Sequence, residues 1–149
     1  MSKTLDSFET FYKFNEIDKK NPIVFVHGIG LSHEIWAPQI DYFKNYSTIV
    51  YDLMGHGKTP LKRKALNIKN FSNQLLGLIN VLNVNKIHLV GFSLGSLIAR
   101  DFASLHNDRL NSLIISGTVY KRTEDEKRQI INRYETMKKN KEVSKKRAL

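Results

Sequence analysis

Four short apolar runs that alternate with segments of helical periodicity constrain the fold of this chain most. The helical segments span residues 33–44, which include Pro38, then 70–82 and 97–106. A roughly alternating run at 8–14 predicts one further, half-buried strand. Strands separated by helices of this length predict an α/β fold with a mostly parallel sheet and flanking helices. The apolar runs, typical of buried parallel strands, are 23–26, 48–51, 86–90 and 113–116.

The composition is that of one globular core. The 149 residues include no cysteine, which excludes a disulfide scaffold, a thiolate metal site and a cysteine nucleophile. The first ten residues contain acidic side chains and no apolar run, so we expect no secretory signal. No run approaches the roughly 18 apolar residues of a membrane helix. We therefore expect a cytoplasmic protein with no membrane partner.

Positive charge is concentrated near the C-terminus. Residues 121–149 contain eleven Lys and Arg against five acidic residues, within a chain of formal net charge +10. Such a segment can bind nucleic acid or an acidic membrane, or it can be a solvated helix face followed by a disordered end. We favour the solvated face, and expect no nucleic acid partner, because no aromatic ladder accompanies the charge. We predict a boundary between residues 1–120 and 121–149, with a helix over 124–140 whose apolar positions are Ile130, Ile131, Tyr134 and Met137.

The most informative motif is Gly91-Phe92-Ser93-Leu94-Gly95, which follows an apolar strand and precedes a helix. A sharp strand-to-helix turn strains the serine backbone and exposes its hydroxyl above the sheet edge. The flanking glycines permit the strand and the helix to approach closely. The alternative is a glycine-rich packing turn whose serine is incidental, and the strand–turn–helix context argues against it.

A second loop, His27-Gly28-Ile29-Gly30, also follows a buried strand. Loops at the carboxyl ends of neighbouring parallel strands lie together, so we expect this loop beside Ser93. The backbone N–H groups of Ile29 and Leu94 would then form a two-donor oxyanion hole. Without the serine turn, the same tetrapeptide would be only a plain turn.

These two motifs, with Asp52-Leu53-Met54-Gly55-His56-Gly57-Lys58-Thr59 between them, resemble the α/β-hydrolase superfamily in order and spacing. The similarity extends over about residues 7–140 and is greatest to small ester and lactone hydrolases such as the 3-oxoadipate enol-lactonases and carboxylesterases. The resemblance implies that Ser93 is the nucleophile, that Ile29 and Leu94 supply the oxyanion N–H groups, and that no cofactor is needed. It also implies a substrate pocket lined by Gly28, Gly30, Trp36 and Phe92. Thr59 departs mildly from the family, which commonly has serine there.

In this family the catalytic Asp or Glu and then the His follow the serine. The only histidine after Ser93 is His106, 13 residues on along the same predicted helix and thus about 20 Å away. Asp101 lies about 12 Å along that helix, and Asp108 lies past its end. A general base must come within about 3 Å of the hydroxyl, so none of the three can serve.

The histidines before Ser93 are also poor bases. We expect His27 to bond the backbone and shape its turn, His56 to stabilise its own loop, and His88 to be a strand residue that packs in the core or toward a helix. His33 lies near enough to the crevice to line it, and His27 or His33 could contact substrate. We expect no metal site, since no two histidines have ligand spacing on one element.

The resemblance also implies that residues 121–149 are the start of the cap helix over the pocket and a basic tail, and that the rest of the cap, the last strands and the catalytic Asp and His lie beyond residue 149. The run 113–116 would then be an exposed edge strand. We expect a serine hydrolase of small esters or lactones that is incomplete as an isolated chain and that a C-terminal chain could complete. The alternatives are an inactive fragment or interaction protein that keeps the fold, or another reaction on it, such as carbon–carbon bond hydrolysis or cofactor-free peroxidation.

Overall fold

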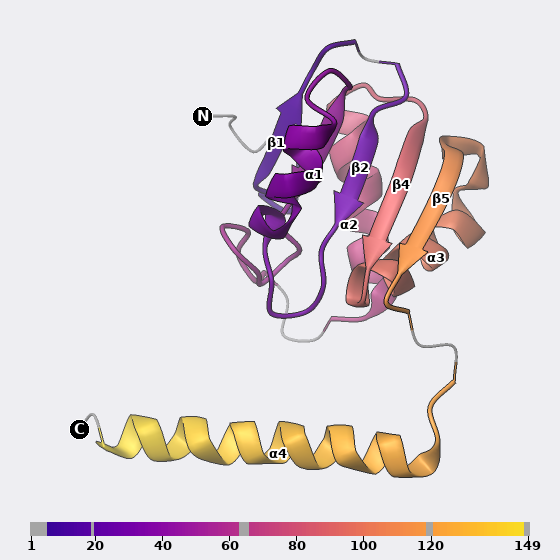
Figure 1. Ribbon diagram of the computed structural model, residues 1–149. Coiled ribbons are helices and arrows are strands. Elements are labelled where there is room, and N and C mark those ends of the chain that lie inside the picture. The colour runs from indigo at the N-terminus through magenta and orange to yellow at the C-terminus, as the bar shows by residue number, and fades with distance from the viewer. Residues whose placement is uncertain (1–5, 19, 63–65, 119–120, 148–149) are drawn as a thin grey trace. The chain divides into compact units, whose positions relative to one another are not determined.

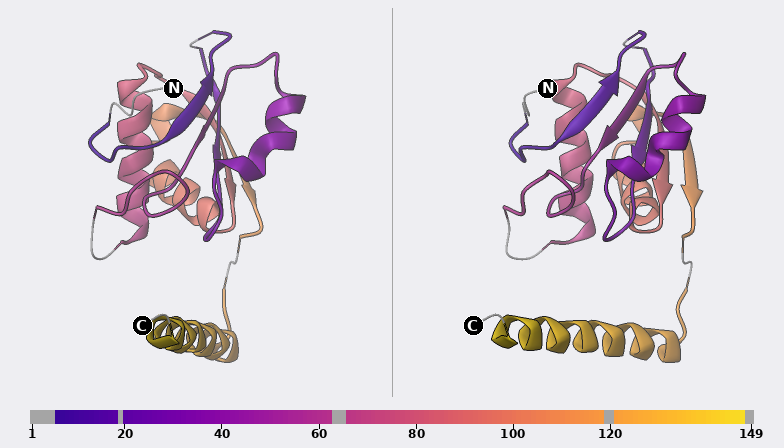
Figure 2. Two further views of the ribbon diagram at one scale, coloured as in Figure 1. Left: turned by 90° about the vertical axis from the view of Figure 1, so that its left-hand side faces the viewer. Right: turned by 60° about the vertical axis from the view of Figure 1, so that its left-hand side comes forward.

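The computed structural model describes residues 6–18, 20–62, 66–118 and 121–147. They fall into two compact units, residues 1–118 and 119–149. The first unit contains one five-stranded sheet with helices on both faces (Figures 1 and 2), so the predicted α/β class is confirmed. The strands are β1 (Tyr12–Asn15), β2 (Ile23–Val26), β3 (Thr48–Tyr51), β4 (Ile87–Phe92) and β5 (Leu110–Ser116).

The sheet order is β1-β3-β2-β4-β5. The pairs β2–β3, β2–β4 and β4–β5 are parallel, and only β1 is antiparallel to its neighbour β3. The carboxyl ends of the central strands therefore meet at one edge, where the loops after β2, β3 and β4 gather. The helices are η1 (His33–Trp36), α1 (Ala37–Tyr42), α2 (Ile68–Val81), α3 (Leu94–Leu105) and η2 (Asn107–Arg109).

A hydrophobic core lies on each face of the sheet. The main core joins the strands to α2 and α3 and contains fully buried side chains such as Leu75, Leu89 and Phe102. The smaller core lies under α1, where Trp36 packs with Phe25 and Val50. Figure 2 shows α1 on the opposite face of the sheet from α2 and α3.

Two predicted elements begin or divide differently in the structure. The first strand begins at Tyr12 rather than residue 8, because the Asp6 carboxylate accepts bonds from the Thr10 N–H (2.8 Å) and hydroxyl (2.6 Å) and closes a turn. The single helix predicted over 33–44 is a 3₁₀ turn followed by α1. Pro38 lies in the first turn of α1 and has no N–H to continue a helix from the preceding turn.

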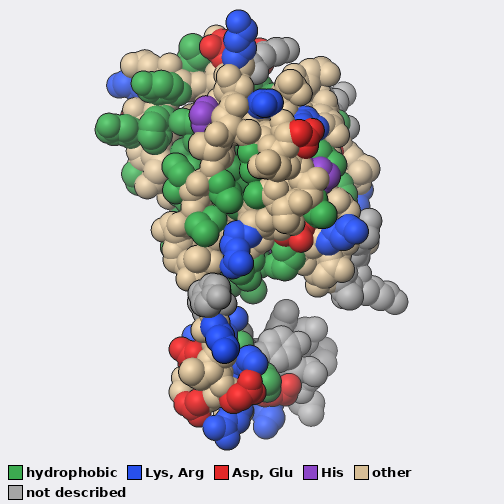
Figure 3. Space-filling model, turned by 90° about the vertical axis from the view of Figure 1, so that its right-hand side faces the viewer, with side chains coloured by type: hydrophobic (Ala, Val, Ile, Leu, Met, Phe, Trp, Pro, Cys, Tyr) green, Lys and Arg blue, Asp and Glu red, His purple; other side chains and the backbone are tan. Residues whose placement is uncertain are grey.

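The apolar composition of 113–116 predicts a buried strand, and this prediction is wrong. β5 is the outer strand of the sheet in the part of the chain that the structure describes, and Leu113, Ile114 and Ile115 are exposed. Figure 3, viewed from the β5 side, shows hydrophobic side chains on this surface. The exposed edge strand that the family resemblance implies for 113–116 is therefore present in the described part of the chain.

The other segments keep their predicted type with shifted ends. α2 begins at Ile68 because Asn67 and Asn70 form a reciprocal capping box, and α3 begins at Leu94, immediately after the serine. In the second unit, α4 (Glu124–Arg147) extends beyond the predicted residue 140, and the side chains of Tyr134 and Met137 lie outside the described residues. No helix in the described ranges is both long and apolar enough to cross a bilayer.

Candidate active site

Ser93 occupies the single residue between β4 and α3. Its backbone angles are φ 54° and ψ −115°, a conformation that costs a residue with a side chain about 1–3 kcal/mol. Its N–H donates to the Ser116 carbonyl of β5 at 3.0 Å, which ties the turn to the neighbouring strand. The predicted strained strand-to-helix turn is therefore present, and Ser93 is partly exposed on it.

The two glycines of the motif lie where side chains cannot fit. A Cβ atom at Gly91 would lie 2.3 Å from the Gly95 carbonyl oxygen, and one at Gly95 would lie 2.1 Å from that of Val26. Real Cβ atoms essentially never approach closer than 3.0 Å. The start of α3 is therefore packed directly against β2 and β4, which confirms the close approach expected from these glycines.

The loop after β2 lies against Ser93. A Cβ atom built on Gly28 would be 3.2 Å from Ser93 Cβ and 3.4 Å from Phe92 Cδ1. Ile29 is 72% exposed, and Gly30 adopts a positive φ of 72° with no neighbouring atom where a Cβ would lie. The structure therefore brings Gly28, Phe92 and Ser93 together as expected, while the donor roles of Ile29 and Leu94 stay predictions.

His27 is fully buried and bonds the backbone on both sides of its ring. The Leu53 N–H donates to Nε2 at 3.0 Å, so the ring proton is on Nδ1, which donates to the Gly28 carbonyl at 2.8 Å. Burial lowers the pKa of His27 below its ordinary 6.5 and outweighs the opposing effect of the Gly28 carbonyl. The expectation that His27 shapes its turn is confirmed, and both ring nitrogens are already used.

A buried Asp52–His33 pair holds the loop after β3, and sequence reasoning missed it. Asp52 Oδ1 accepts bonds from the His33 N–H (2.7 Å) and from Nδ1 (2.8 Å), and Oδ2 accepts from the Lys58 N–H (2.8 Å). Burial by itself raises the pKa of Asp52, but these donors outweigh it and hold the pKa below its ordinary value. No local pattern signals a pair 19 residues apart.

His33 is nearly fully buried and lines a hollow of about 660 Å³ between β1, β3 and α1. Neither Gly28 nor Ser93 lines this hollow, so the two predicted contacts of His33, with the crevice and with substrate, stay predictions.

The remaining histidines are also engaged away from Ser93. His56 bonds the Met54 carbonyl at 3.1 Å within its own loop, as expected. His88 is only partly buried on the sheet face and bonds Ser112 at 2.8 Å, and the His106 ring packs on Phe102 at the far end of α3. No side chain among residues 6–18, 20–62, 66–118 and 121–147 hydrogen-bonds the Ser93 hydroxyl, and no group of three potential metal ligands occurs in these ranges.

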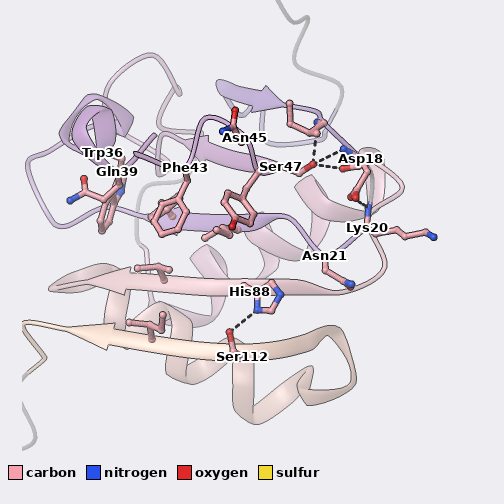
Figure 4. Close-up of a pocket in the computed structure, with 16 residues that line it drawn as sticks. Asp18, Lys20, Asn21, Trp36, Gln39, Phe43, Asn45, Ser47, His88 and Ser112 are labelled. Carbon is pink, nitrogen blue, oxygen red and sulfur yellow. Dashed lines mark hydrogen bonds between the residues drawn. The ribbon is translucent and has the colours of Figure 1, made fainter. Parts of the chain in front are cut away.

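A hollow of about 550 Å³ lies beside α1 over the face of β2, β4 and β5 (Figure 4). Its floor includes Phe25, Val90 and Ile114, and His88 and Ser112 lie at one side. Trp36 lines this hollow, with its ring 5.0 Å from that of Phe25. Ser93 does not line it, so the role of Trp36 in a substrate pocket stays a prediction.

This chain matches the model of a known protein family and is similar in sequence to named hydrolases. A family model described as "alpha/beta hydrolase fold" matches residues 21–140. The (E)-2-((N-methylformamido)methylene)succinate hydrolase of Acinetobacter baylyi is 33% identical over 140 residues, which cover 93% of this chain and 53% of that protein. The 3-oxoadipate enol-lactonase 1 of the same organism is 30% identical over 100 residues, which cover 66% of this chain and 37% of that protein.

Solved structures agree on the fold. A thermophilic esterase from Thermogutta terrifontis, solved with malate bound, aligns with a TM-score of 0.71 and 26% identity over 82% of this chain and 46% of its own. This chain therefore spans about half, or less, of the length of the relatives described here.

Proposed function

The chain belongs to the alpha/beta hydrolase fold family, and we propose that it carries the nucleophile of a serine hydrolase of small carboxylic esters or lactones. The observation that supports this most is the position of Ser93, which stands on a strained turn between β4 and α3 with the Gly28 loop against it. A fold alone does not fix a reaction, so the proposal depends on this local geometry.

In the proposed reaction, the Ser93 hydroxyl attacks the acyl carbonyl and loses its proton to a general base. The N–H groups of Ile29 and Leu94 bind the resulting oxyanion, and one such donor typically contributes about 3 kcal/mol to transition-state stabilisation. The alcohol leaves as an acyl-enzyme forms, and water then releases the acid. The substrate contacts Gly28, Gly30, Trp36 and Phe92.

The general base in this proposal comes from residues other than these 149. The ring nitrogens of His27 are occupied by Leu53 and Gly28, and His106 lies at the far end of α3. A continuation of the chain or a complementing chain would supply the acid and the base.

Residues 121–149 would form the start of the cap helix and a basic tail. The absence of cysteine supports a cytoplasmic location.

The names of the relatives support a small-molecule substrate. One is named an enol-lactonase, which supports the lactone part of the proposal, and another a hydrolase of a methylene succinate derivative, which supports only a small molecule. We extend neither individual substrate to this chain.

A serine-reactive fluorophosphonate tests the proposal on the full 149-residue chain. We expect slow labelling of Ser93 in preference to the other ten serines, and its loss in Ser93→Ala. Oxyanion binding and positioning alone retain about 10³–10⁴-fold catalysis over water, so turnover of p-nitrophenyl acetate should be weak or absent. Ser93-dependent turnover at ordinary enzyme rates would refute the external base, and labelling spread evenly over serines would refute the proposal.

A second candidate function is that of an interaction protein that keeps the fold. The exposed apolar side chains Leu113, Ile114 and Ile115 on the outer strand favour it, together with the basic residues of α4. Such a protein needs no activated serine, so the labelling experiment separates the two candidates.

A further inference from the structure

Ser96 hydrogen-bonds the backbone of the proposed nucleophile. It lies in the first turn of α3 and is fully buried. Its hydroxyl donates to the Ser93 carbonyl at 2.6 Å and lies 3.3 Å from the Ser116 carbonyl, while its N–H also donates to the Ser93 carbonyl at 3.0 Å. Ser96 therefore joins the turn, α3 and the end of β5.

The Ser93 carbonyl, which accepts the bond from the Ser96 hydroxyl, shares a peptide group with the Leu94 N–H, one of the two proposed oxyanion donors. The Ser93 carbonyl and the Leu94 N–H belong to one planar trans unit, so they point in opposite directions and rotate together. Fixing the carbonyl fixes the direction of the N–H. The other proposed donor is held in the same way, because His27 bonds the Gly28 carbonyl, which shares its peptide group with the Ile29 N–H.

Back-bonding by a helical serine is common, so the bond by itself is weak evidence. Ser104 provides the internal comparison, because it makes the same bond to the Asp101 carbonyl at 2.8 Å in the same helix. That bond is exposed and its acceptor lies in regular helix, whereas Ser96 is buried and holds a residue at φ 54°. Ser104 therefore bonds only regular helix, whereas Ser96 bonds the strained residue of the proposed site.

We propose that Ser96 is a positioning residue that orients the Leu94 N–H toward the oxyanion by holding the Ser93 carbonyl. This inference rests on the proposed function of Ser93. Removing the hydroxyl leaves both carbonyls with one N–H partner each, from Ser96 and Ser93, so Ser96→Ala keeps buried groups paired and should remain folded.

Fluorophosphonate kinetics on the full-length chain test the role. In Ser96→Ala, we expect the maximal labelling rate of Ser93 to fall about tenfold, the effect of one hydrogen bond, with the half-saturating probe concentration unchanged. Ser96→Cys, a near isostere with a weaker donor, should recover part of the rate, and Ser104→Ala should match the parent chain. An unchanged rate in Ser96→Ala, or an equal loss in Ser104→Ala, would overturn the inference.

Amide hydrogen exchange gives a readout that does not depend on reactivity. We expect the Ser93 and Ser96 amides to exchange about tenfold faster in Ser96→Ala, with the amides of β2 unchanged. If the parent chain is not labelled at Ser93, the proposed function fails, and exchange still decides whether Ser96 holds the turn. Unchanged exchange at both amides would overturn the inference in either case.

Discussion

Replacing Gly95 by alanine tests the packing on which the candidate site depends. Alanine is the better helix former by about 1 kcal/mol, so propensity alone predicts stabilisation at the start of α3. The new Cβ would, however, lie 2.1 Å from the Val26 carbonyl oxygen and 2.8 Å from that of His27. Both atoms are backbone and cannot rotate away, so α3 must move about 0.9 Å relative to β2 merely to reach a 3.0 Å contact.

Overpacking of this kind typically costs about 1–3 kcal/mol, and the rigid neighbours place Gly95→Ala near the upper end. We expect a net loss of about 2 kcal/mol or more in the free energy of unfolding, measured by urea denaturation followed by circular dichroism. Gly77→Ala is the matched control, because a Cβ there, within α2, would meet the Phe8 ring at an ordinary 3.4 Å. It should stabilise by about 0.5–1 kcal/mol. If Gly95→Ala were neutral or stabilising, the close contact between α3 and β2 would be wrong.

Three further predictions concern the surroundings of the site. Burial lowers the pKa of His27 below 6.5, so as the pH falls the unfolded chain takes up a proton before the folded chain does. The free energy of unfolding should therefore decrease from pH 7 to 5. An equal decrease in His27→Gln would show that another group causes this pH dependence. Gln74→Leu should lower that free energy by about 2 kcal/mol in urea, because it leaves the buried Met54 N–H unpaired; a loss below about 0.5 kcal/mol would contradict this. Ile114→Lys should reduce light scattering at high protein concentration, because a charged side chain on the exposed outer strand opposes its pairing with a second chain. Unchanged scattering would contradict this.

Local patterns predict the strands and the turn because their causes are local. Residues 24–26 and 48–51 are buried within the sheet, and the apolar runs 23–26 and 48–51 predict this directly. Gly91, Ser93 and Gly95 record a steric requirement within five residues. Composition, spacing and backbone geometry therefore agree at the candidate site.

Features that depend on distant partners could not be predicted in this way. The apolar run 113–116 has the composition of an interior strand, but its exposure depends on what lies beside it. Asp52 and His33 meet only after the sheet forms, and Ser96 gains its meaning from the carbonyls of Ser93 and Ser116. A hydrogen-bond network between elements leaves no periodic trace in the sequence.

The backbone of Ser93 has a consequence for variation at this position. Glycine adopts a positive φ without the steric penalty that a Cβ incurs, so a library screened only for thermal tolerance should enrich glycine at position 93. A library screened for acyl transfer should retain serine despite its lower melting temperature. Divergent outcomes of the two screens would measure how far folding and chemistry compete for one residue.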